Sequence, residues 1–202
     1  MRKRMVALSC CIGMCMLMAA CGTKLDVQEN TIALQRNGKI LEAAVETFDQ
    51  SYYKEDELNS YIQNAVDDYT AEHGKKSVSV TESKVEEKKA YLTLQYENAE
   101  TFQDFSGIEC FSGSIVEAQS AGYDFEQDFY PVTDGKADKK TVRGSSLLED
   151  DDLKVLIVKE NSDLIVPYVS TEGTEVTSEK QVNVTQKQQD TDESVLVYVL
   201  YR

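Results

Sequence analysis

Apart from its carboxylates, the protein has few side chains of the types that act as general bases or metal ligands. His73 is the only histidine, and Cys110 is the only cysteine beyond residue 21. A zinc site built on several histidines or thiolates is therefore excluded. A Ser-His-Asp triad would have to recruit His73, and no Gly-x-Ser-x-Gly turn presents a serine to it. Glycine motifs for phosphates or dinucleotides are absent as well, so we expect neither a metal ion nor a cofactor.

The two isolated reactive residues both favour structural roles. His73 falls at the end of a predicted helix, where a cationic side chain complements the carbonyl dipoles, so we expect a cap and not a catalyst. Cys110 lies between apolar neighbours in Gly107-Ile108-Glu109-Cys110-Phe111. We therefore predict a small buried core residue and not a nucleophile.

Carboxylates are the abundant reactive groups, with 36 Asp and Glu against 21 Lys and Arg. The run Glu149-Asp150-Asp151-Asp152 would suit a hard cation such as calcium, but it lacks the alternate spacing and the glycine of an EF-hand loop. A solvated turn is the favoured interpretation, with a cation site as the alternative. A carboxylate pair for glycoside hydrolysis is also conceivable, although no spacing singles out one pair.

The first 21 residues carry the clearest motif. Three basic residues at positions 2–4 precede an uncharged apolar stretch over residues 5–20, which is shorter than the ~20 residues that span a bilayer core. The stretch ends in Leu17-Met18-Ala19-Ala20-Cys21, which resembles the lipobox of bacterial lipoproteins, with Met18 where leucine is usual. The resemblance implies that residues 1–20 are a signal peptide and that Cys21 carries a lipid whose acyl chains include palmitate. The alternatives are an ordinary signal cleaved after an Ala-x-Ala-like site and an uncleaved membrane helix.

This interpretation predicts an exported protein anchored by lipid on Cys21 to the outer face of the cell membrane. Residues 21–30 would form the lipidated Cys21 and a short tether, whose polar part, residues 23–30, reaches at most about 30 Å. Removal of residues 1–20 takes away three basic residues and no acidic residue, so the formal charge changes from −15 to −18. A chain this acidic is repelled by nucleic acid and by anionic headgroups, so we expect the lipid alone to hold it at the membrane.

The body of the chain alternates between strand and helix patterns. Residues 31–36 and 39–48 flank Asn37-Gly38, which predicts a hairpin with a two-residue turn. Residues 54–73 predict the main amphipathic helix. Its apolar face, tyrosines included, is expected in the core and consists of Leu58, Tyr61, Ile62, Ala65, Val66 and Tyr69.

A second hairpin is predicted over residues 77–83 and 89–97, and short helices over 99–105 and 114–120. The C-terminal half is predicted to be rich in strands. Its expected elements are a third hairpin over 154–158 and 164–166, a weaker strand pattern over 174–185, an exposed loop over 186–193 and a central strand over 194–201. Together these patterns predict an α+β fold, with residues 31–202 as a single domain that has a possible subdivision near 126–153.

The order of predicted strands and helices over residues 31–125 resembles that of small uncharacterised lipoproteins of anaerobic Gram-positive bacteria. The stretches that carry the resemblance are Thr47-Phe48-Asp49-Gln50-Ser51-Tyr52-Tyr53 and Ala121-Gly122-Tyr123-Asp124. It implies no activity.

From these observations we expect a non-catalytic binding or interaction module of the cell envelope, whose partners are the membrane, through Cys21, and an envelope protein or polymer. The alternative is a carboxylate-dependent hydrolase that acts on a cell-wall polymer or peptide. A solute-binding subunit of an importer is disfavoured, because the 182 residues left after removal of residues 1–20 are few for two lobes around a ligand.

Overall fold

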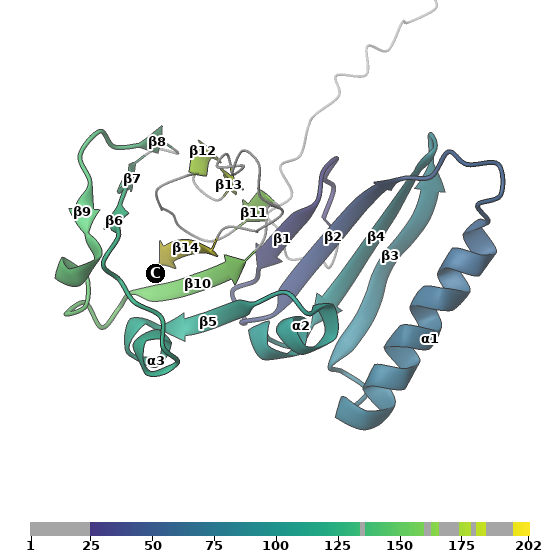
Figure 1. Ribbon diagram of the computed structural model, residues 1–202, viewed down its shortest axis with the longest axis horizontal. Helices are drawn as coiled ribbons and strands as arrows, with labels where there is room; N and C mark the ends of the chain where they lie inside the picture. The colour runs from purple at the N-terminus through teal and green to yellow at the C-terminus, as the bar shows by residue number, and fades with distance from the viewer. Residues whose placement is uncertain (1–24, 134–135, 160–162, 166–173, 179–180, 185–195) are drawn as a thin grey trace, which may run out of the picture.

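The computed structural model of the protein describes residues 25–133, 136–159, 163–165, 174–178, 181–184 and 196–202 (Figure 1). The predicted signal peptide, Cys21 and the predicted loop over 186–193 lie outside these residues. Within the described chain, three α-helices pack with two main β-sheets. The predicted α+β fold is confirmed.

The larger sheet has seven strands in the order β12-β13-β11-β1-β2-β4-β3. Its strands are β1 (Thr31–Leu34), β2 (Ile40–Thr47), β3 (Val78–Glu86), β4 (Lys89–Tyr96), β11 (Asp163–Ile165), β12 (Thr174–Ser178) and β13 (Gln181–Val184). The β1–β2 and β3–β4 pairs are antiparallel hairpins, as predicted. Strand β11 runs parallel to β1 and thereby joins the C-terminal half to the N-terminal half.

The turn between β1 and β2 is longer than the predicted two residues. The Gln35 N–H donates to the Lys39 carbonyl at 2.8 Å, so the turn comprises Arg36, Asn37 and Gly38. Gly38 has a φ of 83°, and the Asn37 side chain accepts a hydrogen bond from the Lys39 N–H at 3.2 Å. Three-residue turns that end in a left-handed glycine are the next most common hairpin connection, so Asn-Gly identified the hairpin but not its loop length.

The helices occupy the segments that their apolar spacing predicts. They are α1 (Glu55–His73), α2 (Ala99–Ser106) and α3 (Ile115–Ser120). Helix α1 lies along β3 at one side of the larger sheet, and α2 lies near β4 and β5 (Figure 1). In α1, Ile62 and Val66 are buried, but Tyr61 is 75% exposed, so its predicted place in the core is wrong. Because α1 packs mainly on the edge strand β3, only the middle of its apolar stripe meets the sheet, and Tyr61 lies at the margin of that stripe.

The second sheet contains β5 (Cys110–Ser114), β10 (Lys154–Lys159) and β14 (Leu196–Tyr201), in the order β14-β10-β5. The predicted third hairpin is therefore wrong, because β10 pairs with β5 and β14 while β11 belongs to the larger sheet. Residues Val155–Val158 of β10 are all buried. A strand buried on both faces needs hydrogen-bonding partners at both of its edges, and β5, which was not predicted, supplies one of them.

Strand β14 lies at an edge of its described sheet, so its predicted central position is also wrong. Its residues Val197 to Leu200 are nevertheless all buried. Val197 and Val199 face the main core, whereas Tyr198 and Leu200 face a second core. The apolar residues on both faces of β14 thus reflect two packed layers and not two neighbouring strands.

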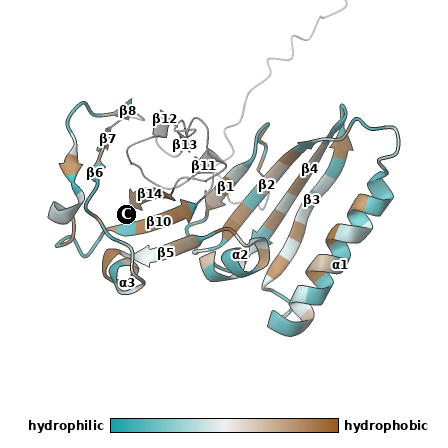
Figure 2. Ribbon diagram, in the orientation of Figure 1, coloured by the Kyte–Doolittle hydropathy of each residue, from teal (hydrophilic) through white to brown (hydrophobic). Residues whose placement is uncertain are grey.

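The main core joins the two sheets. It contains Ile40 of β2, Phe102 of α2 and Leu156 of β10, all fully buried. The second core lies on the other face of β10 and β14, where α3 contributes Ile115 and Ala118. Figure 2 shows β10 and β14, which contribute to both cores, as brown, hydrophobic strands.

The segment between the second sheet's strands β5 and β10 contains only short elements after α3. They are β6 (Asp128–Phe129), β7 (Val132–Thr133), β8 (Lys136–Ala137), β9 (Val142–Arg143) and the 3-10 helix η1 (Gly144–Ser146). Strand β6 pairs with β9, and β7 pairs with β8.

Candidate functional site

His73 is the last residue of α1, as predicted, and it joins α1 to α2. Its imidazole ring stacks on the Tyr69 ring with 4.0 Å between centroids. Its Nε2 lies 3.8 Å from Asp104 Oδ2, and Tyr69 Oη donates to the same oxygen at 2.8 Å. The His73 and Asp104 side chains are about half exposed. This arrangement ties two helices together and supports a packing role for the only histidine.

Cys110 is buried in β5, which confirms its predicted place in the core. Burial raises the pKa of its thiol to about 12. A thiol with this pKa is protonated at neutral pH and is a poor nucleophile.

The acidic run forms an exposed turn, which is the favoured interpretation of the sequence. Asp150 Oδ2 accepts a hydrogen bond from Arg202 at 2.6 Å, and Asp150 Oδ1 accepts the Asp152 N–H at 3.1 Å. In the described part of the chain, no group of three or more His, Cys, Asp or Glu side chains is arranged to hold a metal ion.

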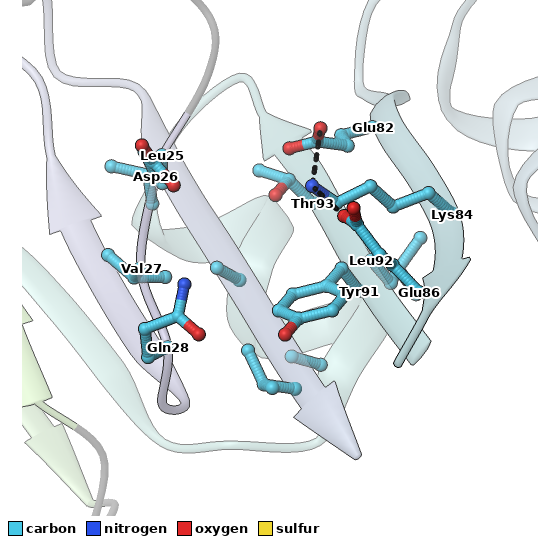
Figure 3. A pocket seen from close by; sticks show the side chains of 13 residues that line it. Leu25, Asp26, Val27, Gln28, Glu82, Lys84, Glu86, Tyr91, Leu92 and Thr93 are labelled. Atoms are coloured by element: carbon cyan, nitrogen blue, oxygen red, sulfur yellow. Dashed lines mark ion pairs between the residues drawn. The ribbon is translucent and has the colours of Figure 1, made fainter. Parts of the chain in front are cut away.

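A groove with a volume of about 400 Å³ lies on one face of the larger sheet (Figure 3). It is the face opposite α1, because Glu82 and Lys84 of β3 line the groove while Ser83 between them donates to Asn59 of α1. Its floor is formed by β2 and β4, through residues that include Ala43, Val45 and Thr93. One wall is the segment Leu25–Gln28, which we call the N-terminal strap. The opposite wall is formed by three side chains of β3, Glu82, Lys84 and Glu86.

The strap is held on the sheet by side chains. Leu25 and Val27 are half-buried while Asp26 and Gln28 are exposed, so alternate residues turn toward the sheet. The Asn30 side-chain oxygen accepts the Val45 N–H at 2.8 Å and so fixes the chain where it turns into β1. Residues 25–30, which the sequence assigned to the tether, therefore run alongside the sheet, where Leu25–Gln28 line the groove and Asn30 bonds to β2.

Lys84 is the central charge of the groove. Its Nζ lies 3.4 Å from Glu86 Oε2, 3.9 Å from Glu82 Oε1 and 4.9 Å from the centroid of the Tyr91 ring. The hydrogen bond to Glu86 raises the pKa of Lys84, so this side chain stays cationic. The dashed lines in Figure 3 mark the two ion pairs. Paired charges beside an aromatic ring suit the binding of a polar ligand.

A second hollow of about 310 Å³ extends the groove toward the end of β2. It is lined by Gln28, Glu29, Asn30, Val45, Glu46, Thr47 and Lys89. Gln28 and Val45 line both hollows. This groove was not predicted from the sequence, although the alternation of Leu25 and Val27 with polar neighbours is typical of a segment packed on a sheet.

No protein-family model matches the chain, and neither the curated proteins nor the solved structures contain a match. Among the described residues, no helix combines the length and the apolar composition that a membrane span requires.

Proposed function

We propose that this protein is an exported lipoprotein, anchored through lipid on Cys21 to the outer face of the cell membrane, and that it acts there as a non-catalytic binding module of the envelope. The lipobox resemblance at Cys21 supports the anchoring half of the proposal, and the strap brings the anchoring residue close to the groove. Leu25, only four residues after Cys21, already lines the groove on the sheet.

This spacing limits how far the domain can stand from its anchor. Four residues span at most about 14 Å, against about 30 Å for residues 23–30, the polar part of the tether expected from the sequence. A lipid on Cys21 would therefore hold the groove face of the sheet close to the membrane surface. Two acyl chains are enough for stable anchoring, so no basic docking face is needed.

The reactive side chains favour binding over hydrolysis. His73 lies at the junction of α1 with α2, and Cys110 is buried in β5, so neither lines the groove. Two of the carboxylates that line the groove, Glu82 and Glu86, form ion pairs with Lys84.

The anchoring half of the proposal predicts that the full-length chain, expressed in a bacterium with lipoprotein processing, incorporates a palmitate analogue and partitions into the detergent phase. Cys21→Ala should abolish both properties, because it removes the only thiol in the lipobox, Leu17-Met18-Ala19-Ala20-Cys21. Cys110→Ala is the matched control and should label like the wild type. An unlabelled wild type in the aqueous phase would contradict the proposal.

A further inference from the structure

Two exposed tyrosines stand at the end of β2, in the loop that leads into α1. The Tyr52 side chain is 69% exposed and that of Tyr53 is 42% exposed, and both rings belong to one cluster with Phe48. We call Phe48, Tyr52 and Tyr53 the aromatic platform. Exposed rings that contact one another offer a flat apolar surface on which a ligand can pack.

The platform is held in a fixed shape. The Tyr53 ring packs between the other two, with 4.9 Å between ring centroids on either side. The Phe48 N–H donates to the Lys88 carbonyl at 2.7 Å, and the Tyr53 N–H donates to the Gln50 carbonyl at 3.1 Å, which closes a turn. Because the backbone and the rings are already ordered, little conformational entropy would be lost on binding.

Polar groups border the platform. The Gln50 side-chain amide donates to Asp49 Oδ1 at 2.7 Å, and both side chains are exposed. They place an amide and a carboxylate next to the rings. Together with the two phenols, they can exchange hydrogen bonds with a ligand rich in hydroxyl groups.

The charge around the platform excludes several partners. Residues 48–57 and the turn over residues 86–89, which contacts Phe48, together hold six carboxylates and three cations, one of which, Lys54, pairs with Glu57 at 2.6 Å. This negative charge repels anionic lipid headgroups, anionic polymers and nucleic acid. A protein partner would need about 20–30 residues on each side, whereas residues 49–57 are all exposed and, apart from the two tyrosines, polar.

We propose that the aromatic platform binds a neutral glycan of the cell envelope. The C–H groups on one face of a pyranose ring carry partial positive charge, and they pack favourably against the electron-rich face of a tyrosine. The hydroxyl groups at the sugar's rim reach Asp49 and Gln50. This inference rests on the proposed function only in placing the glycan at the outer face of the cell membrane. The stacking itself does not depend on lipid attachment.

The test is co-sedimentation of the full chain, in detergent, with insoluble chitin and with cellulose, two neutral pyranose polymers. The wild type should pellet with at least one polymer, and Tyr52→Ala with Tyr53→Ala should weaken its apparent affinity at least tenfold. Tyr61→Ala is the matched control, because Tyr61 is 75% exposed and has no ring partner among the described residues. It should bind within twofold of the wild type, and circular dichroism should show every variant folded.

Two further variants separate stacking from general apolar contact. Tyr52→Phe keeps the flat ring and should retain most of the binding, whereas Tyr52→Leu keeps an apolar side chain without a flat face and should lose it. Full binding by Tyr52→Leu, as expected of an apolar anchor for a protein, would overturn the proposal. Failure of the wild type to bind either polymer would also overturn it, and would leave the palmitate-labelling result unaffected.

Discussion

Burial controls the ionisation of the core side chains. Tyr96 is fully buried and its hydroxyl donates to the Glu42 carboxylate, and desolvation raises the pKa of this phenol far above its ordinary value. The Cys110 thiol, buried in β5, has a pKa raised by burial to about 12. Both groups are therefore neutral in the folded protein at pH 7. When the pH exceeds their ordinary pKa, the unfolded chain can ionise them and the folded protein cannot, so the free energy of unfolding falls.

Cys110 predicts a specific loss of stability in alkali. The ordinary pKa of a cysteine is 9.0, and the folded value is about 12. Because the folded state binds the proton more tightly, the contribution of this thiol is fully present below pH 9 and is lost as the pH rises toward 12. The loss should be about 1 kcal/mol for each pH unit in that window.

Urea unfolding of the wild type and of Cys110→Ala, at several pH values from 8 to 11, measures this contribution. The difference in free energy of unfolding between the two proteins should shrink above pH 9. Tyrosines titrate in both proteins and cancel in the comparison. A difference that stays constant across this range would show that the thiol is not protected from ionisation.

At the scale of elements, local sequence signals determine where helices begin. Ser114 ends β5 and caps α3: its hydroxyl oxygen accepts the Glu117 N–H at 3.2 Å, while Glu117 Oε2 accepts the Ser114 N–H at 2.8 Å. The Ser114 N–H and the Ser114 hydroxyl, which also donates to Glu117 Oε2 at 2.8 Å, lower the pKa of Glu117. This reciprocal capping box orders α3, which covers the second core with Ile115 and Ala118.

The capping box predicts that Ser114→Ala lowers the free energy of unfolding by about 1 kcal/mol. Ser120→Ala is the matched control, since this hydroxyl donates only to the Val116 carbonyl within the last turn of α3, and it should change stability by less than about 0.5 kcal/mol. Thermal and urea unfolding measure both variants. The effect of Ser114→Ala should decrease as the pH falls below the ordinary glutamate value of 4.5, because protonated Glu117 binds the cap more weakly. Equal effects of the two variants would contradict the assignment.

Pairing between distant strands is not encoded by such local signals. The pattern of residues 154–158 correctly predicted a strand, but nothing in it identified Cys110–Ser114 and Leu196–Tyr201 as its partners. Each partner is separated from β10 by tens of residues, and many apolar strands of similar composition compete for the same edges. The predicted pairing of this strand with the nearest apolar run, around residue 164, is therefore wrong.

At the scale of the whole molecule, the strap predicts the orientation of the domain on the membrane. The groove lies on the opposite face of the larger sheet from α1, and a lipid on Cys21 would lie within about 14 Å of Leu25 along the chain. In the lipidated protein on vesicles, a spin label on Lys84→Cys should be relaxed strongly by nickel-chelating lipid headgroups. Wild-type Cys110 is buried and should not take up the label.

The matched control for this orientation is a spin label on Asp68→Cys, at an exposed position of α1. That label should be relaxed at least several-fold less, because the larger sheet lies between it and the groove. Equal relaxation at the two positions would contradict a fixed orientation of the groove face toward the membrane.

The sequence by itself determined the features that depend on neighbouring residues. These are the lipobox resemblance at Cys21, the helix over residues 54–73, the two N-terminal hairpins and the acidic turn near Asp150. A helix face, a cap or a hairpin turn is stabilised by residues a few positions apart, so its signal lies within one short window of sequence.

The tertiary structure alone decided the features that depend on contacts between distant segments. It placed the strap on the outer face of the sheet, exposed Tyr61, put β14 at an edge and gathered Phe48, Tyr52 and Tyr53 into one platform. Whether an apolar or aromatic residue is buried depends on which surface packs against it. That choice is made by the competition among all apolar surfaces of the chain, which no local pattern contains.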